Sequence, residues 1–319
     1  MLKRLVLVAV VAVACLLFYL NAKNPETSEL TDDVRAAAGG RYVRLTDGVT
    51  HYDVAGPEDG QRVVLVHGFS VPLYIWDSTS VALSAAGFRV ARFDAFGRGY
   101  SDRPDTDYTL DLEVRQIGEL LDSLGWKGPV DLIGLSAGGP VVAAFAGRMP
   151  DRVRSVVFVD PAAGKSGGLP FMFRMPVLGG LFWQAVAVPK MPAGQVTDFV
   201  DPSGWPDWTD RYRVQMQYRG FGRALRRSLL AGASVDLDTL YARVGAVGTR
   251  ALLIWGTEDS TVAITNAEQL TKAIPSIEFH PIDRAGHLPH MERTDVVNPL
   301  LVHFLRPEAD STAGAAPPG

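Results

Sequence analysis

A serine between glycines is the residue of this chain best suited to chemistry. Residues 134–139 read Gly-Leu-Ser-Ala-Gly-Gly, after the apolar run 130–133 and before the helix-forming stretch 140–148. A serine hydroxyl is a weak nucleophile at neutral pH, so an enzyme must hold it clear of the backbone, beside a base and oxyanion donors. Glycines on both sides permit the sharp strand-to-helix turn that does this. The pattern predicts Ser136 as a nucleophile, against the alternative of a small-residue packing turn.

A carboxylate that orients the base is expected at the end of a later strand. Residues 250–255 form an apolar run, and Glu258 and Asp259 follow it closely. A carboxylate in this position faces the crevice where open α/β sheets place their sites, and we predict Asp259 as the acid. Glu258 is an alternative, but successive residues leaving a strand point in opposite directions, so only one can face the base. Asp160, after the run 153–159, is a further alternative, interpreted here as a polar cap or a hinge contact.

The base is predicted to be His287. It lies just after the strand-like residues 277–282, in a loop from which its ring can reach both serine and acid. His290 is about one helical turn further on and is predicted to lie on the surface or face the cap. Strand-like or helical stretches hold three more histidines, which we interpret as structural: His51, His280 and His303.

Two backbone N–H groups are candidates for an oxyanion hole. One belongs to Ala137, directly after the serine, and the other to Phe69, in the His-Gly-Phe loop that follows the apolar run 63–66. Such a loop supplies an N–H opposite the elbow, and loss of one donor typically costs about 3 kcal/mol of transition-state stabilisation. His67 precedes the serine in the chain, so we interpret it as holding this loop by hydrogen bonds and not as a base.

These motifs, in this order, resemble those of the α/β-hydrolases over about residues 41–306. The segment 94–102 is similar to the D-x-x-G-x-G-x-S loop of these enzymes and is interpreted as scaffold around the pocket. The resemblance implies a mostly parallel, doubly wound sheet with a helical cap inserted after the sixth strand. It rests on five motifs in the family's order: 67–69, 94–102, 134–139, 256–259 and 286–287.

The resemblance also implies a reaction. Serine as nucleophile excludes the family's dehalogenases and epoxide hydrolases, which use aspartate there. We expect a serine ester hydrolase, a carboxylesterase or lipase for apolar or lipid-like acyl esters, similar to monoacylglycerol lipases and needing no metal or organic cofactor. A carbon–carbon bond hydrolase of the meta-cleavage type, with the same fold and triad, is the alternative. A non-catalytic ligand receptor on this scaffold is an alternative of another class, disfavoured because every triad residue is present.

Composition limits the partners. With 319 residues and 47% hydrophobic content, the chain can bury one α/β domain of about 250 residues plus an insertion. Its net charge of -4 offers no basic field for nucleic acid. The lone Cys15 excludes an internal disulfide and a thiolate metal cluster. A small-molecule or lipid ester is the expected partner, and the oligomeric state stays open.

The N-terminus has a pattern of its own. Lys3 and Arg4 precede the uninterrupted apolar run 5–20, which would span about 24 Å as a helix. This length falls between a signal-peptide core and a full membrane span of about 20 residues. We interpret residues 1–22 as a membrane anchor, with a cleaved signal peptide as the alternative. The basic flank is expected to stay inside, so the catalytic domain lies outside the cytoplasm, or is secreted or periplasmic after cleavage.

The rest of the sequence divides into a linker, one domain and a tail. Residues 23–40 are predicted to be a linker, 41–306 the hydrolase domain and 307–319 a disordered tail. Between about 162 and 247 the strand-helix alternation lapses, and this segment is predicted to be the cap.

The start of the cap is strongly apolar, which fits packing on the core, an acyl pocket or contact with a bilayer. We expect five residues to contact the substrate: Phe69, Leu135, Phe171, Phe173 and Leu288.

Overall fold

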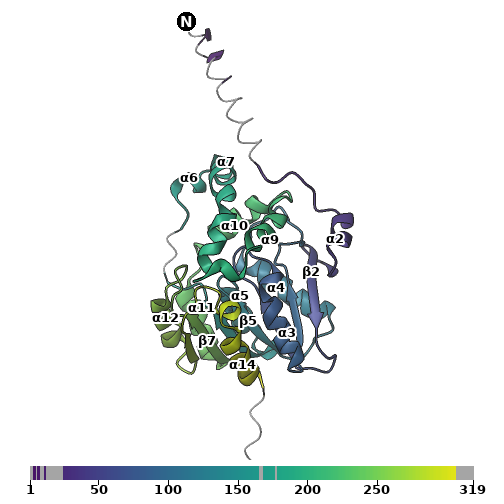
Figure 1. Ribbon diagram of the computed structural model, residues 1–319, viewed down its shortest axis with the longest axis vertical. Helices are drawn as coiled ribbons and strands as arrows, with labels where there is room; N and C mark the ends of the chain where they lie inside the picture. The colour runs from purple at the N-terminus through teal and green to yellow at the C-terminus, as the bar shows by residue number, and fades with distance from the viewer. Residues whose placement is uncertain are drawn as a thin grey trace, which may run out of the picture.

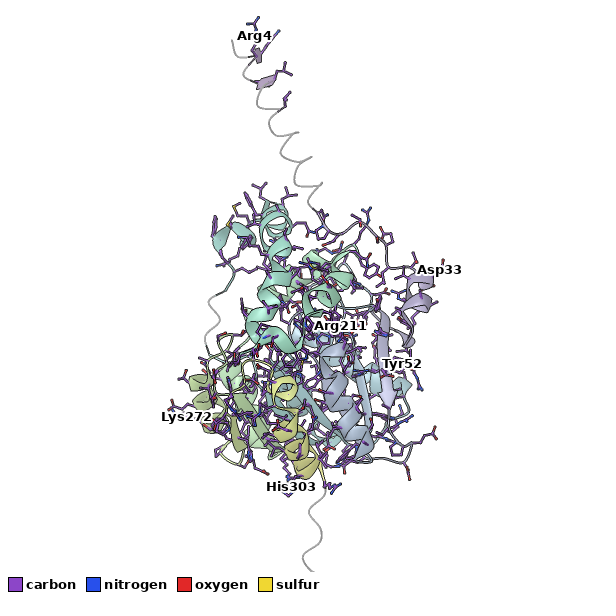
Figure 2. All side chains as sticks on the ribbon, viewed as in Figure 1. Arg4, Asp33, Tyr52, Arg211, Lys272 and His303 are labelled. Carbon is purple, nitrogen blue, oxygen red and sulfur yellow. The ribbon has the colours of Figure 1, made fainter. Side chains whose placement is uncertain are left out.

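The computed structural model describes residues 3, 4, 6, 7, 11, 24–164, 168–176 and 178–306. Figure 1 shows a sheet with helices on both sides and a group of cap helices at one end of the molecule. His303 lies at the end opposite the cap helices (Figure 2).

One eight-stranded sheet runs through the domain in the order β1-β2-β4-β3-β5-β6-β7-β8. The pairs β1·β2 and β2·β4 are antiparallel, and all other pairs are parallel. The predicted mostly parallel sheet is therefore confirmed. The strands are Arg41–Leu45, Gly48–Ala55, Arg62–Val66, Arg89–Phe93, Val130–Leu135, Val153–Val159, Arg250–Gly256 and Glu278–Ile282, numbered β1 to β8.

Helices cover both faces of this sheet, and a separate apolar cluster lies on each face. The α-helices α2 to α14 are Asp32–Ala38, Asp77–Ala85, Leu110–Ser123, Gly138–Arg148, Phe171–Arg174, Leu178–Phe182, Met191–Gly194, Trp208–Met216, Phe221–Gly232, Leu237–Val247, Ala267–Ala273, Pro289–Glu292 and Thr294–Leu305. The short helices η1 to η7, of which η3 is a π-helix, are Leu73–Trp76, Pro150–Arg152, Trp183–Ala187, Val188–Lys190, Gln195–Asp198, Pro202–Gly204 and Ile264–Asn266.

The local sequence explains why the central elements form. Every residue of β5 is buried, as expected for a strand covered on both faces. The helix α4 begins at a Thr109 cap, whose side chain accepts a hydrogen bond from the N–H of Leu112. Its apolar residues recur at helical spacing and pack on the sheet, as the sequence predicts. These elements make the rigid base that positions the strand ends.

The cap follows β6, as predicted, but it ends earlier than residue 247. The helix α11 packs against α5 and α12, and its Tyr241 and Val244 are fully buried in the cluster on that face of the sheet. It is therefore a covering helix of the sheet. The sequence pattern does not separate α11 from the cap helices that precede it, and only its packing shows where it belongs.

Residues 24–40 differ from the expected linker because they are fastened to the domain. The Arg35 guanidinium is buried and forms an ion pair with Asp102. The Glu26 carboxylate accepts hydrogen bonds from the backbone N–H groups of Gly220 and Gly222, at 2.6 and 2.7 Å. This segment joins the cap to the edge of the sheet and fixes where the preceding chain leaves the domain.

Most of the predicted anchor 1–22 and the whole predicted tail 307–319 lie outside the described residues. Within the described residues, no helix has the length and apolar character needed to cross a membrane.

Candidate active site

Four neighbouring strand ends bring the candidate residues together. Ser136 follows β5, Asp160 follows β6 and Asp259 lies three residues after β7. These three strands are adjacent in the sheet, and β8, which precedes the His287 loop, is next to β7. Because the carboxyl ends of parallel strands share one edge of the sheet, residues distant in sequence meet there.

Ser136 has the strained backbone of a nucleophile elbow. Its φ is +50°, in the left-handed region that few side chains adopt. A Cβ at Gly134 would lie 2.5 Å from the carbonyl oxygen of Gly138, and one at Gly138 would lie 2.5 Å from that of Val66. The turn therefore requires these glycines. Within the described residues, the Ser136 hydroxyl makes no hydrogen bond, and such catalytic contacts often tighten only with substrate bound.

His287 and Asp259 form a buried pair. Nδ1 of His287 lies 2.7 Å from Oδ2 of Asp259, and neither residue is more than 7% exposed. The other carboxylate oxygen of Asp259 accepts hydrogen bonds from the backbone N–H groups of Thr261 and Val262. Glu258 is exposed. The structure thus places Asp259, and not Glu258, beside the predicted base.

The cap holds the loop of His287. The backbone N–H of His287 donates to the carbonyl oxygen of Asp198 in the cap, at 2.8 Å. The Glu292 carboxylate accepts from the N–H of Gly286 with one oxygen and from that of Val200 with the other, both at 2.7 Å. These contacts couple the orientation of the imidazole to the position of the cap, which the sequence pattern does not reveal.

The predicted oxyanion donors lie beside the elbow. A Cβ at Gly68 would lie 3.2 Å from the Cβ of Ser136, so the His-Gly-Phe loop passes directly against the serine. In the part of the chain that the structure describes, the backbone N–H groups of Phe69 and Ala137 donate to no protein acceptor. Both residues line one cavity. Two unpaired N–H donors at a serine are the arrangement that stabilises an oxyanion.

His67 and Arg98 hold this loop in place. Nε2 of His67 accepts from the N–H of Ala95 at 2.9 Å, and Nδ1 donates to the carbonyl oxygen of Gly68 at 2.7 Å. Burial lowers the pKa of His67 to about 4, so its ring is neutral and serves structure. Nε of Arg98 donates to the carbonyl oxygen of Phe69 at 2.9 Å. Arg98 belongs to the segment 94–102, and its contact is consistent with the predicted scaffold role.

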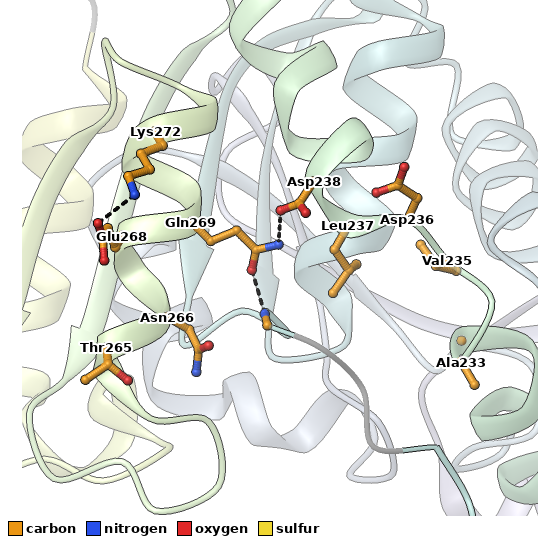
Figure 3. A pocket seen from close by; sticks show the side chains of 12 residues that line it. Ala233, Val235, Asp236, Leu237, Asp238, Thr265, Asn266, Glu268, Gln269 and Lys272 are labelled. Atoms are coloured by element: carbon orange, nitrogen blue, oxygen red, sulfur yellow. Dashed lines mark hydrogen bonds and ion pairs between the residues drawn. The ribbon is translucent and has the colours of Figure 1, made fainter.

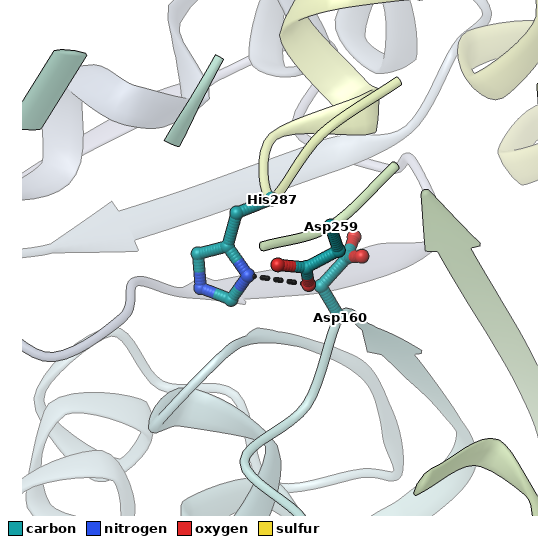
Figure 4. Close-up of side chains that lie close together, drawn as sticks. All are labelled: Asp160, Asp259 and His287. Carbon is teal, nitrogen blue, oxygen red and sulfur yellow. Dashed lines mark hydrogen bonds and ion pairs between the residues drawn. The ribbon is translucent and has the colours of Figure 1, made fainter. Parts of the chain in front are cut away.

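Asp160 lies in one cluster with Asp259 and His287. Its surroundings therefore differ from the polar cap or hinge contact that its sequence position suggests. It is fully buried, and its Oδ1 accepts from the N–H of Gly256 at 2.9 Å. Carboxyl oxygens of Asp160 and Asp259 and a ring nitrogen of His287 all lie within 4.8 Å of one another (Figure 4). We assign these groups to a proton-handling site and not to a metal site, because Nδ1 of His287 is already engaged with Asp259.

An inner cavity of about 240 Å³ is lined by both oxyanion candidates, Phe69 and Ala137. Its wall is mostly apolar, with Leu229 and Val262 among its residues, but Arg98 and Glu113 also line it. We name this space the inner cavity and regard it as the substrate pocket. Apolar pockets with a few polar groups are typical of small-molecule sites.

The expected substrate contacts are only partly found there. Phe69 lines the inner cavity, but Leu135, Phe171, Phe173 and Leu288 do not. Leu135 and Leu288 are buried in the core, Phe173 packs on Trp183 in the cap, and Phe171 is 77% exposed. Of the three interpretations of the apolar cap start, the acyl pocket is not supported for Phe171 and Phe173, which do not line the inner cavity.

A larger outer cavity of about 700 Å³ adjoins the inner one, and the two share the residues Gly164, Gly232, Ala233, Val235 and Leu237. Figure 3 shows its wall between α11 and α12, where Gln269 donates to Asp238 and accepts from the N–H of Gly164. The outer cavity lacks the oxyanion residues, so we regard it as a vestibule of the inner cavity.

His290 corrects a prediction made for the same loop. It is fully buried, not on the surface, and its Nε2 lies 3.1 Å from the carbonyl oxygen of Ile75. Burial lowers its pKa to about 3, so the ring is neutral. Helical spacing alone could not tell which side of the short helix α13 faces the core.

The comparisons with known proteins settle the family. The sequence profile of the α/β hydrolase fold matches residues 61–294. The chain belongs to the α/β hydrolase fold family. It is 30% identical to a 2-hydroxy-6-oxononadienedioate/2-hydroxy-6-oxononatrienedioate hydrolase of Paraburkholderia phymatum, over 86% of this chain and 99% of the relative. It is 26% identical to a putative 2-succinyl-6-hydroxy-2,4-cyclohexadiene-1-carboxylate synthase of Bacillus subtilis, over 82% of this chain and 97% of the relative.

Solved structures share this fold with different reactions. A variant of the meta-cleavage product hydrolase CumD is similar with a TM-score of 0.70 and 25% identity, over 83% of this chain and 97% of that chain. A thermophilic esterase from Thermogutta terrifontis has a TM-score of 0.71 and 24% identity, over 84% and 98%. The latter likeness shows the fold alone. The relatives are named for several reactions, among them hydrolases and a putative synthase, and an enzyme of the α/β hydrolase fold family is what they share with the chain described here.

Proposed function

We propose that the protein is a serine hydrolase that cleaves a bond next to a carbonyl carbon in a small substrate held in the inner cavity. The observation that carries this proposal is the buried pair of His287 and Asp259, 2.7 Å apart, at the same edge of the sheet as the strained Ser136. The pair supplies a base for the serine, and the N–H groups of Phe69 and Ala137, which have no protein acceptor among the described residues, supply the donors for the oxyanion.

The steps follow from these positions. Ser136 Oγ attacks the carbonyl carbon while Nε2 of His287 takes its proton, and Asp259 keeps Nδ1 protonated and stabilises the imidazolium. The carbonyl oxygen, now negative, accepts from the N–H groups of Phe69 and Ala137. The bond to the leaving group breaks as His287 returns the proton to that group. Water then attacks the acyl-enzyme with the same base, so its hydroxyl goes to the acyl carbon and a proton restores Ser136.

Cleavage of a carbon–carbon bond beside a ketone is the first candidate for the overall reaction. Its support is the similarity to proteins named meta-cleavage product hydrolase or 2-hydroxy-6-oxononadienedioate/2-hydroxy-6-oxononatrienedioate hydrolase, which reaches 30% identity over 99% of one relative. In this reaction His287 would deliver its proton to carbon, so the leaving carbanion must be stabilised by the substrate's own conjugation.

Hydrolysis of an apolar carboxylic ester is the second candidate, and one observation favours it. Glu113 lines the inner cavity, and within the described residues its carboxyl has no hydrogen bond or ion pair. Burial raises its pKa and the charge of Arg98 opposes that shift. When ionised, this carboxyl repels the carboxylates of a dioate substrate, and when protonated it offers them a hydrogen bond but no counter-charge, whereas an uncharged acyl chain needs neither.

One panel of substrates tests both candidates. Purified protein is assayed on p-nitrophenyl esters of increasing chain length and on 2-hydroxy-6-oxodienoate ketones with and without a second carboxylate. Wild type is expected to turn over one class, and Ser136→Ala none. Turnover that survives in Ser136→Ala would contradict the proposal, and turnover of the esters only would replace the first candidate by the ester reaction.

A further inference from the structure

The start of the cap exposes large apolar side chains to solvent. We name six of them the cap apolar patch: Phe171, Met172, Leu178, Leu181, Phe182 and Val186. They lie on α6, α7 and η3, which follow one another in the chain and contact each other. Phe171 is 77% exposed and Leu178 51%, although Trp183, which follows them in the cap, is buried. Contiguous exposed apolar side chains of this size mark a surface that binds something.

The cap apolar patch is held rigidly in this orientation. The Arg226 guanidinium on α10 donates to the carbonyl oxygens of Phe173 and Met175, at 2.7 and 3.2 Å, which fixes α6 and the turn after it. A Cβ at Gly179 would lie 2.6 Å from the carbonyl oxygen of Phe173, so α6 and α7 pack closely. The side chains of the cap apolar patch are therefore exposed although the helices that carry them are fixed in place.

The chain enters the domain beside this patch. Nε2 of Gln184 donates to Asn24 Oδ1 at 2.5 Å and to Glu26 Oε1 at 3.0 Å. Gln184 lies two residues after Phe182 and two before Val186. Figure 1 shows α6 and α7 at the same end of the molecule as the N-terminus of the chain.

The apolar run 5–20 ends four residues before Asn24. A chain advances at most about 3.5 Å per residue, so the end of that run lies within roughly 14 Å of Asn24. If the run 5–20 enters a bilayer, the end of that run and the cap apolar patch therefore lie close to the same lipid surface.

Exposed cations accompany the patch. Arg174 ends α6 and Lys190 ends η4, and both are exposed and without an ion pair in the described part of the chain. An apolar group flanked by free basic side chains matches a bilayer, whose acyl chains lie beneath phosphate groups.

We propose that the cap apolar patch inserts into the surface of the lipid bilayer in which the run 5–20 is anchored. The insertion turns the cap toward the membrane. The helix α10 contacts η3 near its beginning and lines the inner cavity with Ser228, Leu229 and Gly232 near its end. A substrate that dissolves in the bilayer would thus meet the cap first. The proposal concerns where the enzyme works and does not depend on which bond it cleaves.

Lipid quenching tests the contact directly on the full-length chain. A single environment-sensitive fluorophore is attached to Phe171→Cys or Leu181→Cys in a Cys15→Ser background, and the protein is reconstituted into phosphatidylcholine and phosphatidylglycerol vesicles. Lipids with spin-labelled acyl chains are expected to quench these labels about twofold or more, because the patch would lie at the acyl boundary. The matched control is Val81→Cys on α3, where the native side chain is 71% exposed but far from the cap in sequence.

Equal quenching at all three positions, or none at the cap positions, would overturn the proposal. Mutual quenching between labels on two chains, in place of quenching by lipid, would show that a second copy covers the patch and would overturn it as well. Mass spectrometry of the reconstituted protein must find residues 1–22, since a chain that begins near Lys23 contradicts the shared surface.

A double variant, Leu181→Ser with Phe182→Ser, tests the consequence. Hydrolysis of a substrate carried in vesicles is expected to fall about fivefold, because less apolar area enters the bilayer. Hydrolysis of the same chemical class in a short, water-soluble form should not change. A variant that hydrolyses both forms as fast as wild type does would contradict the proposal. Absence of turnover on either form in wild type would instead count against the proposed function, and lipid quenching would still decide the contact.

Discussion

Asp160 and Asp259, which follow neighbouring strands, place their carboxyl groups together in a buried site beside His287. Asp160 is fully buried and keeps an uncommon φ of +41°. Burial, followed by the charge of Asp259, raises the pKa of Asp160 well above its usual range. Two ionised carboxylates cannot share such a site, so Asp160 holds a proton and Asp259 carries the charge. His290, Asp198 and Glu292 are the other titratable groups that act on this cluster.

Turnover should separate the two acids. Asp259→Asn is expected to lower kcat by about a thousandfold or more, because His287 loses the acceptor that fixes its tautomer. Asp160→Asn should cost little, since an amide keeps a neutral donor and an acceptor for the N–H of Gly256 and tolerates the left-handed backbone. The acid limb of the pH profile of kcat/KM should stay in place in Asp160→Asn. A limb that moves to lower pH would mean that the variant has removed a negative charge, and that Asp160 is ionised.

The pH dependence of the free energy of unfolding should reveal the same proton on Asp160. The folded state keeps a proton on Asp160 that the unfolded chain releases above its ordinary pKa of 3.8. Folding stability from this group is therefore lost as pH rises from that value toward the folded pKa, by about 1.4 kcal/mol per pH unit. Urea unfolding at several pH values should give a flatter dependence for Asp160→Asn than for wild type. Parallel curves would contradict a neutral Asp160.

The sharp turn at Ser136 is predictable from the sequence because its requirements are local. Ser136, its glycines and the flanking apolar runs are consecutive in the chain, and each has a steric reason in the fold. The order of motifs also places Asp259 and His287 in adjacent loops. The carboxyl cluster is harder, because Asp160 and Asp259 follow equivalent strands and only the structure shows that both reach one histidine.

The errors of the sequence-based predictions lie where packing between distant segments determines the position of a helix or side chain. The cap boundary depends on α11 packing against α5, and the burial of His290 depends on its contact with Ile75. Composition identified an apolar cap segment but could not say which way Phe171 faces. Sequence patterns determine what a helix face contains, whereas the neighbouring element determines whether that face meets core, cavity or solvent.

The nucleophile prediction is tested by labelling. A fluorophosphonate probe should react with wild type and not with Ser136→Ala, while circular dichroism stays unchanged because the hydroxyl of the partly exposed Ser136 makes no hydrogen bond within the described structure. As a matched steric test, Gly68→Ala should slow labelling, since its Cβ would lie 3.2 Å from the Cβ of Ser136. Labelling of Ser136→Ala at another serine would show that the elbow is not the site.

The oxyanion loop should depend on Arg98. Its guanidinium donates to the carbonyl oxygens of Phe69 and Phe96 and to Ser228 Oγ, each at 2.9 Å. Arg98→Lys keeps the charge but cannot make all three bonds, so the Phe69 N–H loses its fixed position. We expect kcat to fall about tenfold or more, with a smaller change in KM, because the oxyanion forms only after attack. Ser228→Ala, which removes one acceptor and leaves the Phe69 contact, is the control and should cost much less.

The N-terminal segment gives the last prediction. Lys3, Arg4 and the apolar run 5–20 predict an anchor, and the Glu26 contacts to Gly220 and Gly222 show that the domain is already fastened before residue 41. Removal of residues 1–22 leaves those contacts intact, so the truncated protein should keep its circular dichroism spectrum and its rate on water-soluble substrates. Unlike full-length protein, it should not remain in the membrane fraction after a carbonate wash. It should also hydrolyse substrates carried in vesicles more slowly. Full-length protein recovered from the soluble fraction with residues 1–22 intact would contradict the anchor, and a mature chain that begins near Lys23 would replace it with a cleaved signal peptide.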